Sequence, residues 1–108
     1  DMAFILTRVL DLPGQFADLD PDTVDAILGE AAKLAADILA PLNHAGDKTG
    51  GCVLKDGSVT TPPGFRAAYA QYRDGGWNAV PFSPDHGGQG LPWAMAFAVQ
   101  EMWQGANM

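Results

Sequence analysis

The chain is poor in the residues that catalysis, metal binding and nucleic-acid binding require. Its 108 residues include one cysteine and two histidines, and 13 acidic side chains outnumber six basic ones for a net charge of −7. Because binding to phosphate groups needs clustered Lys and Arg, we expect no nucleic-acid partner and no anionic membrane partner. The lone Cys52 excludes an intrachain disulfide, which favours a reducing compartment, and we expect a cytoplasmic location.

Long apolar runs are also absent. No run approaches the roughly 18 residues that a bilayer-spanning helix needs, and the first residues lack the basic region of a signal peptide. The apolar content of 47% is typical of a folded globular chain, and the length predicts a single domain over 1–108. The chain begins with Asp and ends at Met108 with no helix-stop signal beyond Gly105, so we expect a segment of a longer polypeptide.

Two helices are predicted in the first part of the chain. Asp1–Leu10 reads as a short apolar helix that Pro13-Gly14 ends. A clearer helix is predicted over 21–40, because Asp20 is a good N-cap and apolar residues recur at three- and four-residue steps. Pro41 is expected to stop or kink this helix.

Two further helices are predicted in the second part. Thr61 is expected to cap a helix that opens at Pro62 and Pro63 and ends at Gly75-Gly76. A fourth helix begins at Pro92, and apolar side chains cover most of its surface, including Met95, Ala96, Val99, Met102 and Trp103. Because such a helix must be covered on several sides, it needs more polypeptide or a partner chain.

Residues 52–60 differ from the helical remainder. Asp56-Gly57 separates two short runs of strand-forming residues and is a hairpin-turn signal. A small two-stranded hairpin is predicted here, and an extended excursion over the surface is the alternative. The predicted fold class is therefore all-α, a helical bundle with a minor β excursion.

The residues that can carry chemistry form no local catalytic or metal-binding signature. Cys52, His44 and His86 lie in predicted loops or the hairpin, which favours an inert thiol over a Cys–His pair, and no spacing typical of metal ligands is present. Glu101 on the apolar fourth helix is either a base with a raised pKa or, as we favour, part of a polar rim.

The cluster 87–90, Gly-Gly-Gln-Gly, lies just before a helix N-terminus, where anions are favoured. It lacks the Gly-Lys-Ser/Thr ending of a P-loop and does not follow a strand, so a structural loop is favoured over phosphate contact.

Taken in order, these segments resemble the N-terminal helical domain of the acyl-CoA dehydrogenase family. The resemblance rests on the order and spacing of four features: Pro41-Leu42-Asn43, Gly75-Gly76-Trp77-Asn78 with Val80-Pro81, the run Pro84–Pro92, and Gln100-Glu101-Met102-Trp103. The opening, Phe4–Leu6 through Val9–Gly14, is similar to the subgroup that acts on bulkier or sulfur-containing acyl chains, such as the methylmercaptopropionyl-CoA enzymes.

The resemblance implies a flavoprotein oxidoreductase of fatty acid metabolism. It implies FAD as cofactor, an acyl-CoA substrate oxidised to the 2-enoyl-CoA, and a homo-oligomer. The flavin-binding middle domain and the C-terminal domain with the catalytic base are not among these 108 residues. We therefore expect this piece, alone, to bind no FAD, to hold no catalytic or metal-binding residue and to be inactive; the remainder of the same polypeptide would be its partner.

The resemblance also implies roles for particular residues. Met102, Trp103 and Ala106 are candidates for the wall of the acyl pocket. The Gly- and Pro-rich loop of residues 75–92 is held by Trp77, Gly87, Gly88 and Gly90.

Two rival functions remain open. A stand-alone helical module that associates through helix 92–105 predicts a stop codon after Met108, whereas the dehydrogenase predicts continuation into a β-domain. A small hydrolase that uses Cys52 predicts that thiol labelling abolishes its activity.

Overall fold

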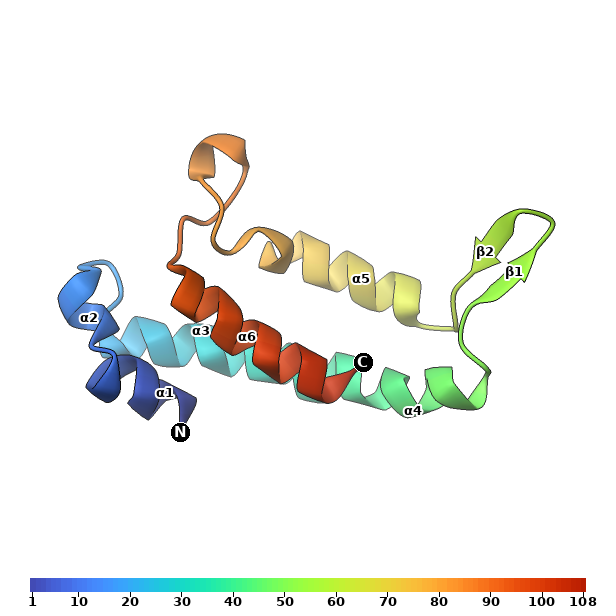
Figure 1. The fold of residues 1–108 in the computed structure, drawn as a ribbon, viewed down its shortest axis with the longest axis horizontal. Helices are drawn as coiled ribbons and strands as arrows, with labels where there is room; N and C mark the ends of the chain where they lie inside the picture. The colour runs from blue at the N-terminus through green and yellow to red at the C-terminus, as the bar shows by residue number, and fades with distance from the viewer.

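A long helix and a second helix packed along it form the frame of the molecule (Figure 1). The structure is a computed structural model that describes all of residues 1–108. The long helix is continuous from α3 (Pro21–Lys33) through the π-helical turn η2 (Leu34–Leu39) to α4 (Ala40–Lys48). The second is α6 (Trp93–Ala106). The predicted all-α class is confirmed.

The N-terminal segment lies at one end of this frame. It consists of α1 (Met2–Phe4), the π-helical turn η1 (Ile5–Val9) and α2 (Leu12–Gln15). The predicted first helix is confirmed, but its expected end at Pro13-Gly14 is wrong. Asp11, in the left-handed region with φ of 50°, separates the two helical pieces, and Pro13 fits into α2 because a first helical turn needs no proline N–H.

The start of the long helix is confirmed and its predicted end at residue 40 is wrong. The Thr23 N–H donates to Asp20 Oδ1 at 2.7 Å, as expected of an N-cap. Pro41 neither ends the helix nor stands in a regular α-helical turn. The Ala40 N–H donates to the Ala35 carbonyl, five residues back, so the turn before Pro41 is wide. The wide turn accommodates the residue that has no N–H, and the helix continues to Lys48.

The predicted hairpin is confirmed, and the alternative of an extended excursion over the surface is not observed. β1 (Val53–Lys55) pairs antiparallel with β2 (Ser58–Thr60), with Leu54 opposite Val59. Asp56 and Gly57 both have positive φ, 50° and 76°, which a tight two-residue hairpin turn requires. All six strand residues are exposed, and the hairpin stands away from the helices (Figure 1).

The third predicted helix begins later than the sequence indicated. α5 (Phe65–Asp74) is preceded by Gly64 with φ of 90°, a conformation that a residue with a side chain rarely adopts, so the expected cap at Thr61 is wrong. The predicted end at Gly75-Gly76 is confirmed. The loop that follows contains two short 3-10 turns, η3 (Trp77–Ala79) and η4 (Pro84–His86).

The core lies between the long helix and α6. Its buried side chains come from the long helix, from α6 and from the N-terminal segment: Leu6, Leu12, Leu19, Val24, Leu28, Ala31, Leu34, Ala35, Met95, Ala98, Val99 and Trp103. Burial of each larger apolar side chain contributes about 1.5–3 kcal/mol. No helix combines the length and the hydropathy needed to cross a bilayer.

Asp20 makes the start of the long helix sensitive to acid. The hydrogen bond from the Thr23 N–H lowers the pKa of Asp20, so the folded state binds this proton more weakly than the unfolded state. The stabilisation is therefore present above the unfolded pKa and lost as the pH falls through the folded pKa. Between about pH 7 and about pH 3, urea unfolding should show a larger stability loss for the natural protein than for Asp20→Asn, which keeps a cap but does not titrate. Equal losses would contradict this.

Candidate functional site

The outward side of α6 carries large aromatic side chains that the rest of the chain leaves exposed. Met95, Val99 and Trp103 point into the core, whereas Trp93 is 56% and Phe97 63% exposed. Since these rings lie one helical turn apart, with centroids 5.9 Å from each other, they form one apolar surface. This observation supports the interpretation that α6 has more apolar surface than the chain covers.

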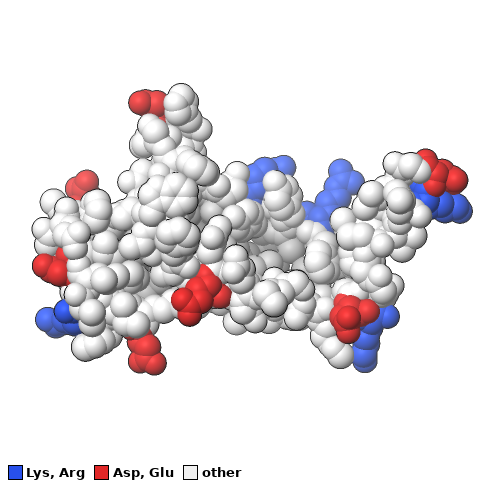
Figure 2. Space-filling model, in the orientation of Figure 1, with Lys and Arg blue, Asp and Glu red and all other residues white.

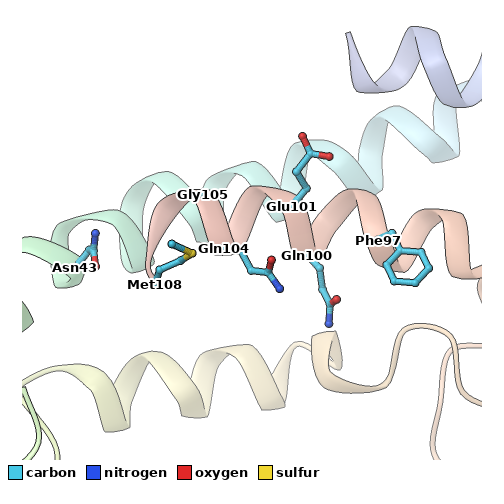
Figure 3. Close-up of a pocket in the computed structure, with 7 residues that line it drawn as sticks. All are labelled: Asn43, Phe97, Gln100, Glu101, Gln104, Gly105 and Met108. Carbon is cyan, nitrogen blue, oxygen red and sulfur yellow. The ribbon is translucent and has the colours of Figure 1, made fainter.

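An open hollow of about 680 Å³ follows this surface along α6. Figure 3 shows that Gln100 and Gln104 extend from one side of the helix and Glu101 from the other. The hollow is lined by Asn43, Phe97, Gln100, Glu101, Gln104, Gly105 and Met108. Its chemistry is therefore amide and carboxylate beside one exposed aromatic ring.

A groove of about 320 Å³ lies on the α5 side of α6. Most of its lining is apolar or aromatic: Leu39, Leu42, Phe65, Ala68, Tyr69, Tyr72 and Trp103, with Gln100, Gln104 and Asn107. Burial raises the pKa of the Tyr72 hydroxyl, and the neighbouring Tyr69 adds to the shift. The Tyr72 hydroxyl is therefore neutral over the ordinary pH range and cannot serve as a base there.

The backbone N–H groups of the Gly- and Pro-rich loop are hydrogen-bonded within the loop itself. The N–H of each residue in 86–91 donates to a carbonyl within the loop, for example Gln89 to Ala79 and Gly90 to Phe82 at 3.0 and 2.8 Å. Gly87 and Gly90 have positive φ, and Gly88 lies against the Phe82 backbone. Because these N–H groups are occupied, the loop offers no backbone cradle for a phosphate. The bonds support a structural role for the loop.

Of the residues predicted to line an acyl pocket, Trp103 is the one that borders a groove. It is 7% exposed and lines the groove beside α5. Its ring packs edge-on against Tyr72 and Trp77, with centroid distances of 5.1 and 5.3 Å. Met102 and Ala106 are half-buried against the core and line neither the hollow nor the groove, so their role stays a prediction.

The other candidate residues come together only in part. Glu101 is exposed and makes no ion pair. Cys52 and His44 line a common open hollow near the hairpin, but neither side chain makes a hydrogen bond, so the structure shows no Cys–His pair. No group of three His, Cys, Asp or Glu side chains lies close enough to hold a metal ion.

FAD does not fit the residues of this chain. A flavin dinucleotide carries a diphosphate, which proteins hold with free backbone N–H groups or basic side chains. The loop's N–H groups are bonded internally, and no Lys or Arg side chain lines the hollow or the groove beside α6. The Lys and Arg side chains in view in Figure 2 lie towards the edges of the molecule, while most of the face over α6 and the loop is uncharged.

Sequence reasoning missed several residues that line these surfaces. Phe97, Gln100 and Gln104 line the hollow, and Phe82 packs edge-on against Trp93 at 5.9 Å. The sequence pattern that could have identified the three residues of α6 is their spacing. Steps of three and four residues from Phe97 through Gln100 to Gln104 place these side chains on adjoining faces of the helix.

Comparison with known proteins gives two relatives, and no family model matches the chain. The chain is 34% identical over 93 residues to a 3-methylmercaptopropionyl-CoA dehydrogenase of Ruegeria pomeroyi, an alignment that covers 86% of the chain. It is 31% identical over 113 aligned positions to a broad-specificity linear acyl-CoA dehydrogenase of Mycobacterium tuberculosis, which covers 99%. This similarity supports the resemblance of the chain to the acyl-CoA dehydrogenase family. The chain spans 16% and 18% of the length of these two acyl-CoA dehydrogenases.

Loss of the Trp103 ring should destabilise the fold far more than loss of an exposed indole. We expect Trp103→Ala to cost about 3–5 kcal/mol because it leaves a cavity among Tyr72, Trp77 and the core. The matched change Trp93→Ala, at a half-exposed ring, should cost about 1 kcal/mol or less. Chemical denaturation followed by circular dichroism measures both. Comparable losses would show that Trp103 is not a main packing residue.

Gly88 should tolerate no side chain. A Cβ there would overlap the backbone of Phe82, so Gly88→Ala is expected to destabilise by about 1–3 kcal/mol. Gly105→Ala is the control, because that glycine lies in α6 with open space around it, and alanine should stabilise by about 0.8–1 kcal/mol. Thermal unfolding of both variants tests the difference in sign; a neutral Gly88→Ala would contradict the close approach.

Proposed function

We propose that the chain is the N-terminal helical domain of an FAD-dependent acyl-CoA dehydrogenase, which oxidises a saturated acyl-CoA to the 2-enoyl-CoA. The observation that carries this proposal is the similarity to two acyl-CoA dehydrogenases, which extends over 86% and 99% of the chain. The proposal places the flavin and the catalytic base on other parts of the parent protein, because the residues here do not fit a flavin diphosphate.

In the proposed enzyme, this chain contributes the apolar surface of α6. Trp93 and Phe97 are large apolar side chains more than half exposed, and exposed patches of this kind mark surfaces that other groups cover. In the proposed parent, the remaining domains and the acyl group of the substrate cover α6. The chain then serves as one wall of the acyl cavity and excludes water from it. Of the three residues predicted for this wall, Trp103 lines the groove beside α6, and Met102 and Ala106 stay candidates.

One relative is named for a sulfur-containing acyl-CoA and the other for broad linear acyl-CoA specificity. Because the sequence resembles the subgroup with extended N-termini, we place the parent in that subgroup, with a linear or thioether-containing acyl chain as substrate. A homo-oligomer in the cytoplasm is part of the same proposal.

The natural gene product that contains this chain tests the proposal. We expect it to continue beyond Met108, to show the absorbance of bound flavin, and to reduce an artificial electron acceptor only when an acyl-CoA is added. Mass spectrometry should show the acyl-CoA losing two hydrogens. A gene product that ends at Met108, binds no flavin and self-associates would favour the stand-alone module instead.

A substitution on α6 tests the proposed role of this helix as one wall of the acyl cavity. Phe97→Ser should raise the acyl-CoA KM or weaken flavin retention by about tenfold or more, since an apolar contact contributes about 1–3 kcal/mol. Phe16→Ser is the matched control, because Phe16 is also exposed but lies just beyond α2. Equal effects of both variants would reject α6 as the functional surface.

A further inference from the structure

A small cavity lies under the Gly- and Pro-rich loop, between the end of α5 and α6. Its volume is about 120 Å³, and most of its lining side chains are hydrophobic. Six of the chain's ten aromatic residues line it: Tyr72, Trp77, Phe82, Trp93, Phe97 and Trp103. The rest of its wall is largely aliphatic, from Val80, Pro81, Ala96 and Val99.

The walls of this aromatic cavity are held apart by their own packing. Trp103 is fixed edge-on between Tyr72 and Trp77, and its Nε1 donates to the Ala31 carbonyl at 3.4 Å. Val80 and Val99 are each 1% exposed. Close-packed side chains cannot easily turn inward to fill the space, so the inner wall of the cavity, formed by Trp103, Val80 and Val99, is held in place.

The opening of the aromatic cavity is also aromatic. Phe82, Trp93 and Phe97 are each more than half exposed, and Trp93 contacts both of the others with centroid distances of 5.9 Å. A group entering the cavity would therefore bury apolar ring surface that water now covers, which favours its binding.

The polar lining selects against a charged group. No ionisable side chain other than the Tyr72 phenol lines the aromatic cavity, and the only amides are those of Asn78 and Gln100. Neither amide makes a hydrogen bond within the chain. Gln100 also lines the hollow of Figure 3 and the α5 groove, so it stands where the three spaces meet. A neutral chain that lies along α6 can pass this amide and place its end among the rings.

We infer that the aromatic cavity is a binding subsite for the end of a straight aliphatic or thioether chain. The volume sets the size, because a cavity of about 150 Å³ takes benzene, and 120 Å³ therefore suits a chain end of about four or five heavy atoms. A thioether is favoured as well as an alkyl group, because sulfur makes favourable contacts with aromatic ring edges. In naming the acyl tail as the natural occupant, the inference rests on the proposed function.

Intrinsic fluorescence reports directly on this cavity, because all three tryptophans of the chain line it. Ethyl methyl sulfide is titrated into the purified natural gene product that contains this chain, with pentane as the aliphatic probe and naphthalene as a probe too large to enter. We expect a saturable change in the tryptophan emission with the first two probes and none with naphthalene.

Two alanines on α6 provide the variant and its control. Ala96 and Ala98 are both buried, but only Ala96 lines the aromatic cavity. Ala96→Leu fills the space and should weaken binding of ethyl methyl sulfide at least tenfold, whereas Ala98→Leu should leave it unchanged. If Ala96→Leu does not fold, Val99→Ala enlarges the cavity and should shift the preference toward a probe about one methylene longer.

Absence of saturable binding, or the same binding in the natural chain and in Ala96→Leu, would overturn the subsite. So would an unchanged size preference in Val99→Ala. These measurements need neither flavin nor turnover, so they can fail while the whole protein oxidises acyl-CoA, and they can succeed if it does not. In an active parent enzyme, Ala96→Leu should in addition shift the acyl-CoA preference toward shorter chains.

Discussion

The packing of Trp103 is the constraint on which the arrangement of helices depends. Its indole lies between Tyr72 of α5 and Trp77 of the loop, and its Nε1 donates to the Ala31 carbonyl in the long helix. One side chain of α6 therefore contacts both the long helix and the end of α5 with its following loop, two regions that are distant in the sequence. α5 has little other cover, since Ala68 is its one buried residue. The position of α5, and with it the grooves beside α6, thus follows from how this ring is seated.

Charge is distributed very unevenly over this frame. Residues 1–37 carry eight acidic and two basic side chains, whereas residues 38–108 carry five and four. The surface over α6 and the loop is largely uncharged (Figure 2). Because like charges repel, the acidic N-terminal ends of two copies of the chain disfavour contact with one another. The uncharged face is where electrostatic repulsion of another protein surface or of a neutral ligand is weakest.

Sequence reasoning succeeded where the signal is local. The Asp20 cap, the Asp56-Gly57 turn and the Gly75-Gly76 helix end each depend on the conformation of a few neighbouring residues, and each is found as predicted. It failed at Pro41 because the outcome depended on a backbone turn that starts at Leu34, and no residue pattern signals a wide turn. At Thr61, the positive φ of Gly64 decided the helix start instead of the expected cap.

The candidate site could be predicted only in outline. The excess of apolar surface on α6 was visible from its composition, and the exposure of Trp93 and Phe97 bears it out. The aromatic cavity was not visible, because its wall joins Tyr72, the loop and α6, and no sequence period relates these segments. Residues that meet only through tertiary packing leave no spacing to read.

The wide turn at Leu34–Leu39 sets the direction in which the far end of the molecule points. The continuous helix from Pro21 to Lys48 has 28 residues, which at 1.5 Å each gives a length of about 42 Å. Each residue in an α-helix turns the chain by about 100°, so removing one residue from the wide turn would rotate everything beyond it by about that angle. The hairpin would then leave the molecule on another side, although none of its own residues had changed. One residue within Leu34–Leu39 thus decides which neighbours the hairpin can meet.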